Sequence, residues 1–413
     1  MQRIRIMQRI SVGSLILFAA TVAMNAQTGP AWPATVATNG PQYKVDPFWP
    51  KPLPNKWSMQ QIVDIYVDKD DHIWIINRQS DARPDETGAA TNHNIECCVP
   101  GPEIIEFDQQ GNVLKSWDGK GTPGWPGRLQ TLGVDRNLNI YVSGTTPGDT
   151  IAKYDSNGKF LSDFGHRGPK IPANQVKQDN QQTAVFPPGI GAFEFDEDAH
   201  EIYIADGFLN KRILVYDMDT YAFKRGWGGH GIPLSEIDND PIPDYPFPAP
   251  TPPDQKQFAP ALHCAHPSSD GFVYVCERGS DSIQVFTKQG KFVSRYWIHP
   301  QTQSRGPHCG GIWSMTDPPC GTIYNLALST DKEQRYIFVA DGTNNTVWIL
   351  NRKTGAPVGS FGGDGRYAGN LHWIDAIAVD SHGNVYTGEV EDGKRIQKFV
   401  PVNAASKAAA AKK

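Results

Sequence analysis

Six copies of one short pattern run along this chain, and they limit its fold more than any other feature. In each copy a hydrophobic stretch ends at an Asp or Ser, a turn follows, and a second hydrophobic stretch begins. The first stretches of the copies are Ile62–Asp68, Leu132–Asp135, Phe193–Asp196, Leu262–Ser268, Leu326–Ser329 and Ile377–Asp380. A third stretch follows each pair, and several copies add a fourth that ends in an aromatic residue before Gly or Asp. A repeat of this kind indicates an array of small structural units.

Four short strands per copy predict an all-β fold, a six-bladed β-propeller with four-stranded blades. One blade cannot bury both faces of its sheet, whereas a ring of blades can. The sixth copy has three strands and ends near Val402, so we expect the N-terminal segment Tyr43–Phe48 to complete that blade and close the ring. A β-sandwich with coincidental turns is the competing interpretation, and six matched copies disfavour it.

Composition and charge agree with this fold and exclude one class of partner. The chain has 413 residues, of which 40 are Gly and 33 are Pro, as suits many short strands joined by turns. There are 39 Lys and Arg residues against 44 Asp and Glu residues, a net charge of −5. That balance gives no basic surface for a nucleic acid.

The N-terminal residues have the pattern of a targeting segment. Arg3, Arg5 and Arg9 precede an apolar run, Val12–Ala23, which ends in small residues. The run is shorter than the ~20 residues that span a bilayer, so the pattern is typical of a cleaved signal peptide. We therefore expect export to the periplasm or the exterior, with no membrane span after cleavage. The expected divisions are a signal peptide at 1–26, a linker at 27–39, the propeller at 40–402 and a disordered tail at 403–413.

Six cysteines in an exported chain predict disulfide bonds. Cys264 and Cys276 each lie six residues from Asp270, which begins the turn of a hairpin. They should therefore be opposite one another and within disulfide reach.

Long connections carry the other cysteines and offer a binding face. These connections are 78–101, 230–259 and 299–322. Cys309 and Cys320 bracket part of the third one, and we expect them to form a second disulfide. Cys97 and Cys98 are adjacent, and three states stay open for them: a bond to each other, metal binding, or free thiols.

Two segments resemble a known repeat signature. Ala205–Ile213 and Ala340–Val347 resemble the NHL signature, V-A-D-x-x-N-x-R-I. Within that superfamily the chain resembles exported bacterial NHL proteins, which are similar to the lyase domain that cleaves peptidyl-α-hydroxyglycine to an amidated peptide. A shared fold does not by itself give a function.

Aligning the repeats places one residue of each blade at the start of its innermost strand, five residues before the Asp or Ser. This set is Val63, Gln130, Gly191, His263, Tyr324 and Asp375. The lyase resemblance implies a zinc-binding His at this position in alternate blades, which here carry Gln130, His263 and Asp375. Only His263 keeps that ligand type.

A divalent metal is nonetheless a hypothesis for the axis of the ring. The candidate ligands are His263, Asp375, Gln130 and His372. Zinc prefers His, Cys or carboxylate ligands, whereas a set rich in oxygen suits calcium better. The competing interpretation is that His263 is a hydrogen-bonded residue that lines the funnel. Gln130, His263 and Asp375 should converge at one mouth of the channel, with Tyr324 nearby.

Two further residues are candidates for catalysis. Tyr324 would act as a base, and Arg278 would bind a carboxylate with both of its terminal nitrogens. Arg278 could equally be a structural residue of the repeat. Two functions therefore stay open: a metal-dependent carbon–nitrogen lyase, and a non-catalytic scaffold that binds a peptide, a small molecule, a glycan or an envelope protein. A calcium-dependent lactonase would need a carboxylate and Asn constellation that the sequence does not reveal.

Overall fold

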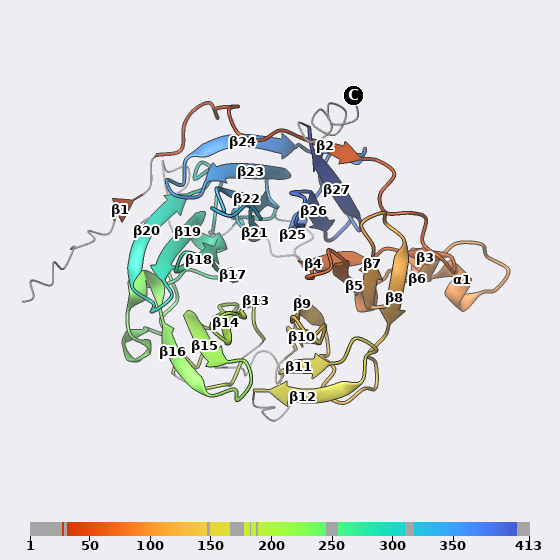
Figure 1. The fold of residues 1–413 in the computed structure, drawn as a ribbon, viewed down its shortest axis with the longest axis horizontal. Coiled ribbons are helices and arrows are strands. Elements are labelled where there is room, and N and C mark those ends of the chain that lie inside the picture. The colour runs from red at the N-terminus through yellow and green to blue at the C-terminus, as the bar shows by residue number, and fades with distance from the viewer. Residues whose placement is uncertain are drawn as a thin grey trace, which may run out of the picture.

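The computed structural model describes residues 27–28, 31–146, 149–165, 177–181, 183–186, 189–244, 255–306, 308–309 and 318–402. Six four-stranded antiparallel blades surround a central axis (Figure 1). The predicted all-β, six-bladed β-propeller is confirmed. The expected signal peptide and C-terminal tail lie outside the described residues. Within the described ranges, no helix is long and apolar enough to cross a membrane.

Each blade is a meander that runs outward from the axis. Blades one to three are β4 (Gln61–Val67), β5 (Ile73–Arg78), β7 (Ile104–Phe107) and β8 (Val113–Trp117); β9 (Leu129–Val134), β10 (Ile140–Gly144), β11 (Ile151–Tyr154) and β12 (Phe160–Phe164); and β13 (Ala192–Asp196), β14 (Glu201–Asp206), β15 (Arg212–Asp217) and β16 (Phe223–Trp227). Blades four and five are β17 (Leu262–Pro267), β18 (Phe272–Glu277), β19 (Ser282–Thr287) and β20 (Phe292–Trp297); and β21 (Asn325–Leu328), β22 (Tyr336–Asp341), β23 (Thr346–Asn351) and β24 (Pro357–Gly362). Blade six is β25 (Ile374–Val379), β26 (Val385–Glu389), β27 (Ile396–Pro401) and β2 (Tyr43–Asp46).

The Asp that recurs in the sequence forms the first hairpin turn of a blade. In the second blade, Asp135 Oδ1 accepts hydrogen bonds from the backbone N–H groups of Asn137 and Asn139. Ser268 stabilises the equivalent turn of the fourth blade, where its hydroxyl accepts a hydrogen bond from the Phe272 N–H. Side chains of this kind stabilise tight turns because they satisfy backbone donors that no strand partner reaches.

The hydrophobic core lies between blades rather than inside one of them. Between the first and second blades, Trp74 and Ile104 pack with Leu132 and Tyr154, and all four are at most 2% exposed. Similar clusters fill the other five interfaces of the ring. The repeats therefore depend on one another for burial, as the ring architecture requires.

The N-terminal segment ties the ring together. β2 pairs with β27, with Val45 opposite Phe399, and is the fourth strand of the sixth blade. The segment expected to be a linker, 27–39, also contacts the ring. β1 (Gln27–Thr28) pairs in parallel with β20, and the Trp32 ring lies 5.1 Å from the Trp348 ring.

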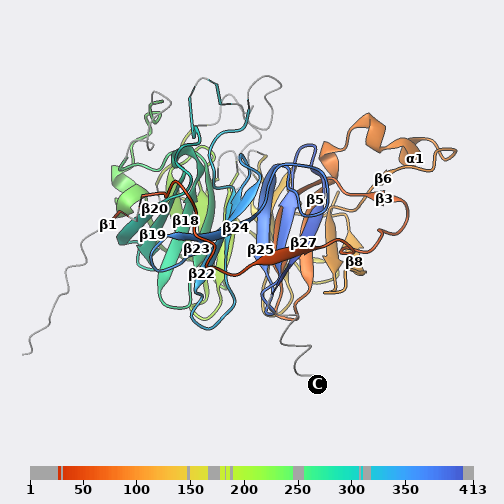
Figure 2. The ribbon, with the colours of Figure 1, turned by 90° about the horizontal axis from the view of Figure 1, so that it is seen from above.

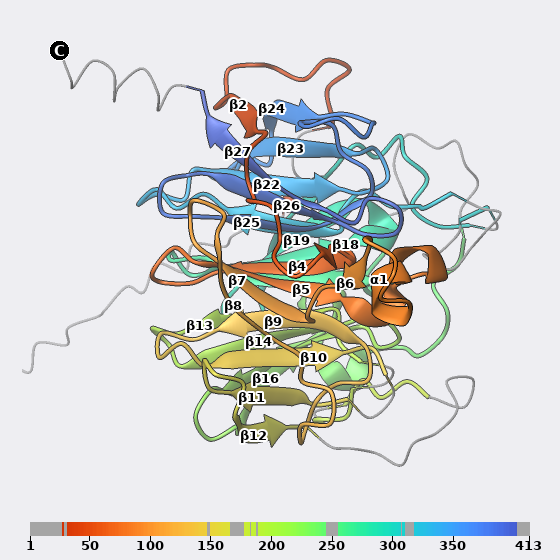
Figure 3. The same ribbon diagram turned by 90° about the vertical axis from the view of Figure 1, so that its right-hand side faces the viewer.

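The described parts of the long connections lie on one face of the ring, which we call the loop face (Figures 2 and 3). Innermost strands begin on this face and second strands end on it, because neighbouring strands of a blade are antiparallel. One connection carries α1 (Gly88–Thr91) and a small parallel pair, β3 (Trp57–Ser58) and β6 (Val99–Pro100). The Asp and Ser turns lie on the opposite face, which we call the turn face.

All six cysteines form disulfides. Cys264 and Cys276 are directly opposite one another, with their Cα atoms 4.9 Å apart, which confirms the first predicted pair. Cys309 and Cys320 form the second predicted pair, with a Cα–Cα distance of 5.3 Å. Cys97 and Cys98 are bonded to each other, which was one of the three open alternatives.

Candidate functional site

Residues of the predicted axial set are placed by a repeated irregularity of the backbone. In four blades the pairing of the innermost strand skips one residue, so Val63, Gln130, His263 and Asp375 are each the extra residue of a β-bulge. A bulge bends the strand and turns its side chain in a new direction, and bulges are frequent next to functional sites. The alignment therefore identified structurally equivalent positions on the loop face.

Tyr324 is the centre of one cluster at this mouth of the channel. Its side chain is 2% exposed. The His263 ring meets it edge to face at 5.6 Å, and Arg278 Cζ lies 4.9 Å above its centre. Burial raises the pKa of Tyr324, while Arg278 acts in the opposite direction. A tyrosine with a raised pKa stays protonated, which disfavours the predicted role of Tyr324 as a base.

His263 presents a ring nitrogen without a partner. The residue is 7% exposed, and its buried Nε2 forms no hydrogen bond to any of the residues that the structure describes. Burial, followed by the charge of Arg278, holds the pKa of His263 well below its usual range. A hydrogen bond to the Tyr324 backbone acts in the opposite direction, and Nδ1 must make it because Nε2 has no partner. His263 is therefore a neutral imidazole whose free lone pair is on Nε2.

Arg278 provides a positive charge that is not neutralised by a contact. It begins a 3₁₀ turn, Arg278–Ser280, directly after β18, and its side chain is half-buried. In the described part of the chain, the guanidinium forms no ion pair or hydrogen bond, and its Cζ lies over the Tyr324 ring. A cation held over an aromatic ring keeps its hydrogen-bond donors available for a ligand.

Asp375 and Gln130 lie among two more arginines. Arg78 is 2% exposed, and its Nη2 donates a hydrogen bond of 2.7 Å to Gln130 Oε1. Arg128 Nη2 pairs with Asp81 at 2.6 Å. Burial raises the pKa of Asp375 to about 6, while Arg78 and then Arg278 act in the opposite direction. The charges of Arg278 and Arg78 thus both act on the pKa of Asp375. Asp375 therefore lies between the Tyr324 cluster and the cluster of Arg78 and Gln130.

His372 is set apart from this group. Burial lowers its pKa, and the charged side chains that influence it are Arg366, Asp364, Asp392 and Arg395. None of these is a neighbour of His263 or Tyr324 in the cluster above.

The side chains at this mouth do not fit a zinc centre. Zinc at a catalytic site needs three protein ligands plus water. Among the described residues, no group of three closely spaced His, Cys, Asp or Glu side chains includes His263 or Asp375. The oxygen of Gln130 is already engaged by Arg78, and guanidinium charges oppose a divalent cation. The metal therefore stays a prediction without support from this geometry.

One His and carboxylate group does occur in the described residues, away from the axial set. It comprises Asp68, His72 and Glu106. Asp68 accepts hydrogen bonds from the backbone N–H groups of Asp70 and His72 and from Trp74 Nε1. These bonds make Asp68 a turn residue of the repeat, which explains the grouping without an ion.

A second polar group lies further along the innermost strands. His266 Nε2 is 3.3 Å from Glu194 Oε1 and 3.3 Å from Asn325 Oδ1. Asp64 accepts a 2.9 Å hydrogen bond from the Leu132 N–H. Burial raises the pKa of Glu194 and of Asp64 to about 8 and lowers that of His266 to about 4.

The sequence interpretation missed Arg78, although a signal for it exists. Arg78 directly follows Asn77 at the end of a second strand, and Arg278 directly follows Glu277 at the matching place. The other blades carry Gly, Thr or Val there. Since these are the first and fourth of six blades, the two arginines approach the axis from opposite sides.

One comparison with known proteins supports the repeat type. No family model matches the chain. NHL repeat-containing protein 3 from Homo sapiens is 23% identical over 315 residues, which cover 73% of this chain and 74% of that protein. A solved structure described as a streptogramin B lyase superposes with a TM-score of 0.48 and 12% identity, covering 87% of this chain and 98% of the other. The similarity to peptidyl-α-hydroxyglycine lyases stays a prediction. The six blades, their repeats and the similarity to the human protein together support an NHL-type β-propeller.

Proposed function

We propose that this chain is an exported propeller that binds a small anionic ligand, a carboxylate or phosphate, at the loop-face mouth of its channel. The observation that carries the proposal is the guanidinium of Arg278, held over Tyr324 next to Nε2 of His263, because neither group has a hydrogen-bonding partner among the described residues. Arginine forms two parallel hydrogen bonds with a carboxylate, and a neutral imidazole accepts a further bond from a ligand N–H or O–H. Phe208, whose ring lies 5.5 Å from that of His263, adds an apolar contact.

The ligand class follows from a cation, a hydrogen-bond acceptor and a pair of aromatic rings at the site. Arg278 selects a negative charge, and His263 selects a donor a short distance from it. Phe208 and Tyr324 favour an apolar or aromatic body. An acylated amino acid, or the C-terminal residue of a peptide, carries all three features. Export is part of the proposal, and the three disulfides favour it because such bonds persist in oxidising compartments.

The proposal can be tested by titration calorimetry with hippurate, an aromatic acylated glycine, and with hippuramide, its neutral amide. Wild-type protein should prefer hippurate. Arg278→Gln should weaken hippurate by roughly 10- to 100-fold, because a hydrogen bond to a charged group contributes about 1.5–3 kcal/mol, and should leave hippuramide unchanged. Arg335→Gln, at an exposed arginine on the turn face, is the matched control. Equal affinity for both compounds, or an unaffected Arg278→Gln variant, would count against an anion site.

Lyase activity is a second candidate, and the free lone pair of His263 favours it. A neutral imidazole with a low pKa is available at neutral pH to accept a proton from a substrate hydroxyl. Loss of that activity in His263→Asn, with unchanged hippurate binding by Arg278, would support catalysis. Elemental analysis of purified protein decides the metal question independently, because a stoichiometric divalent ion would contradict the charge argument above.

A further inference from the structure

We propose that Arg305 is a positioning residue that holds Arg278 in place for its ligand, and that the Cys309–Cys320 disulfide anchors this support. The inference rests on the proposed anion site and extends it to the loop that follows the fourth blade. Arg305 reaches Arg278 through the neighbouring residue Gly279. Its effect passes through the backbone of the turn that carries Arg278.

The first contact is a hydrogen bond to that turn. Arg305 is 8% exposed, and its Nη1 donates to the carbonyl oxygen of Gly279 at 2.6 Å. Its Nε donates to the Pro243 carbonyl at 2.9 Å. Pro243 belongs to the proline-rich connection between the third and fourth blades. One buried guanidinium thus joins two loop-face connections to the residue beside Arg278.

The second contact is made by Gly321, on the other side of Arg278. A Cβ atom added to Gly321 would lie 2.5 Å from both Cγ and the carbonyl oxygen of Arg278. Gly321 also has a φ of +82°, which glycine adopts at little cost. Its N–H donates to the Gln303 carbonyl at 2.9 Å, and its carbonyl accepts a 2.6 Å bond from Thr343. The stem of Arg278 therefore packs against Gly321, while its guanidinium lies over the Tyr324 ring.

The disulfide links both contacts. Cys309 lies four residues after Arg305, and Cys320 directly precedes Gly321. With their Cα atoms 5.3 Å apart, the two cysteines fix the distance between two segments. One carries Arg305, which binds the turn at Gly279, and the other carries Gly321, which lies against Arg278. An arginine needs this help because its long side chain loses much rotamer entropy when it is ordered. A site that orders Arg278 in advance spends less of the ligand's binding free energy on that step.

A double-mutant cycle tests this coupling. Arg305→Met keeps the apolar stem and removes the hydrogen bonds. It should weaken hippurate binding by roughly tenfold, a value consistent with the loss of one hydrogen bond of about 1–1.5 kcal/mol. In the Arg278→Gln background the same change should have no further effect. The Cys309→Ser/Cys320→Ser pair should behave like Arg305→Met, and Arg335→Met should leave the affinity unchanged.

Hydrogen exchange without a ligand separates this inference from the proposed function. In Arg305→Met the Asp281 and Ile298 amides should exchange faster, because these amides donate to Arg278 O and Asp281 O. Wild-type protein that fails to bind hippurate would refute the anion site, and exchange would still report whether Arg305 holds the turn. Normal binding and unchanged exchange in Arg305→Met would overturn the positioning role alone. Equal losses from Arg305→Met in both backgrounds would make Arg305 an ordinary structural residue.

Discussion

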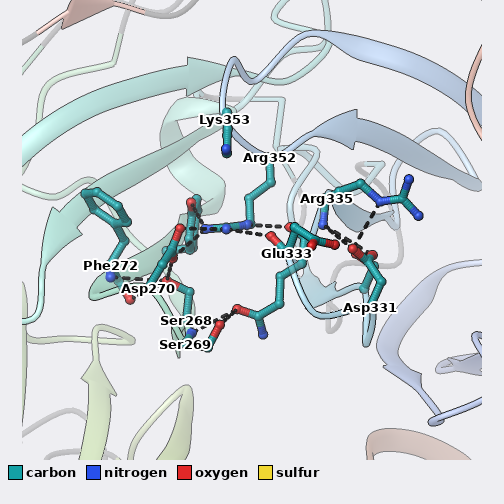
Figure 4. Close-up of polar contacts among 12 residues, drawn as sticks. Ser268, Ser269, Asp270, Phe272, Asp331, Glu333, Arg335, Arg352 and Lys353 are labelled. Carbon is teal, nitrogen blue, oxygen red and sulfur yellow. Dashed lines mark hydrogen bonds and ion pairs between the residues drawn. The ribbon is translucent and has the colours of Figure 1, made fainter.

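Arg352, which follows β23 in the fifth blade, holds the carboxylate of Asp270 in the fourth blade through two hydrogen bonds of 2.8 Å each (Figure 4). The same guanidinium donates to Tyr274 Oη and to the carbonyls of Glu333 and Gln334. Arg352 is 2% exposed. It therefore joins two neighbouring blades at the turn face.

Arg352→Ala should lower the free energy of unfolding by about 2–3 kcal/mol, because it removes the hydrogen bonds of a buried guanidinium that joins two blades, including the bond to the buried Tyr274 hydroxyl. Arg335→Ala is the matched control, since the Arg335 side chain is 63% exposed and pairs with Asp331 alone at 3.1 Å. An exposed pair of this kind contributes less than about 1 kcal/mol. Urea unfolding measures both changes. Equal losses in the two variants would show that the bridge between blades adds nothing.

Removing the Cys264–Cys276 disulfide should destabilise the fourth blade. The bond joins residues separated by 12 positions, and a loop of that size corresponds to about 3 kcal/mol in the chain-entropy treatment. The double substitution to Ala should lower the midpoint of thermal unfolding accordingly. Substituting Cys97 and Cys98 is the contrasting case, because adjacent residues enclose no loop. A larger loss from the second pair than from the first would refute this account.

Tyr43→Ala should weaken the closure of the ring. The Tyr43 ring lies 5.5 Å from Phe338 and 5.1 Å from Phe361, so truncation leaves a cavity between the fifth and sixth blades. Aromatic-to-Ala changes in cores cost about 3–5 kcal/mol, and a partly exposed ring should give the lower value. Lys44→Ala, on the exposed side of the same strand, should cost almost nothing. A similar loss for both variants would show that β2 adds backbone pairing only.

Stability should fall as the pH rises through neutrality, because of Glu194. Its folded-state pKa of about 8 lies above that of an unfolded carboxyl. The folded state then retains a proton that the unfolded state has lost, so the stabilisation present at low pH disappears as the pH approaches about 8. Glu194→Gln should flatten the dependence of unfolding free energy on pH between about 6.5 and 8.

Two titratable residues of the same polar group, Asp64 and His266, also affect how stability depends on pH. Asp64, with a pKa of about 8, retains part of the slope in the variant. His266, with a pKa of about 4, is neutral in the folded state throughout this range. Glu333→Gln, at an exposed carboxylate, is the control. An identical slope in wild-type protein and Glu194→Gln would show that Glu194 is ionised in the folded state.

The sequence alone was sufficient to predict the six blades, because strand periodicity and turn residues are local features of the chain. The predicted first stretch at Ile62–Asp68, for example, matches β4 (Gln61–Val67) to within one residue at each end. The alignment also found the position of His263 and Asp375. It could not show that both are bulge residues, because a bulge shifts pairing without changing the spacing of hydrophobic residues.

The remaining parts of the site depend on contacts between distant segments. Nothing near Arg305 in the sequence indicates that it reaches Gly279, 26 positions away. The partners of Arg278 and the direction of the free His263 nitrogen depend in the same way on how neighbouring blades pack. Assigning the long connections to one face also required the direction of every innermost strand. The metal hypothesis came from family resemblance. It did not take into account the positive charges of Arg78 and Arg128, which lie near Asp375 and oppose a divalent cation.

The pairing of β2 with β27 sets the order in which the molecule can be completed. Tyr43 is opposite Pro401, so β2, the first strand of the ring to be made, can pair only after β27, the last, has been made. During synthesis every nascent chain therefore has an open seam, with unpaired strand edges on both sides, until β27 has been made. Blades one to five can form as each is made, but the circle becomes continuous only when β27 pairs with β2.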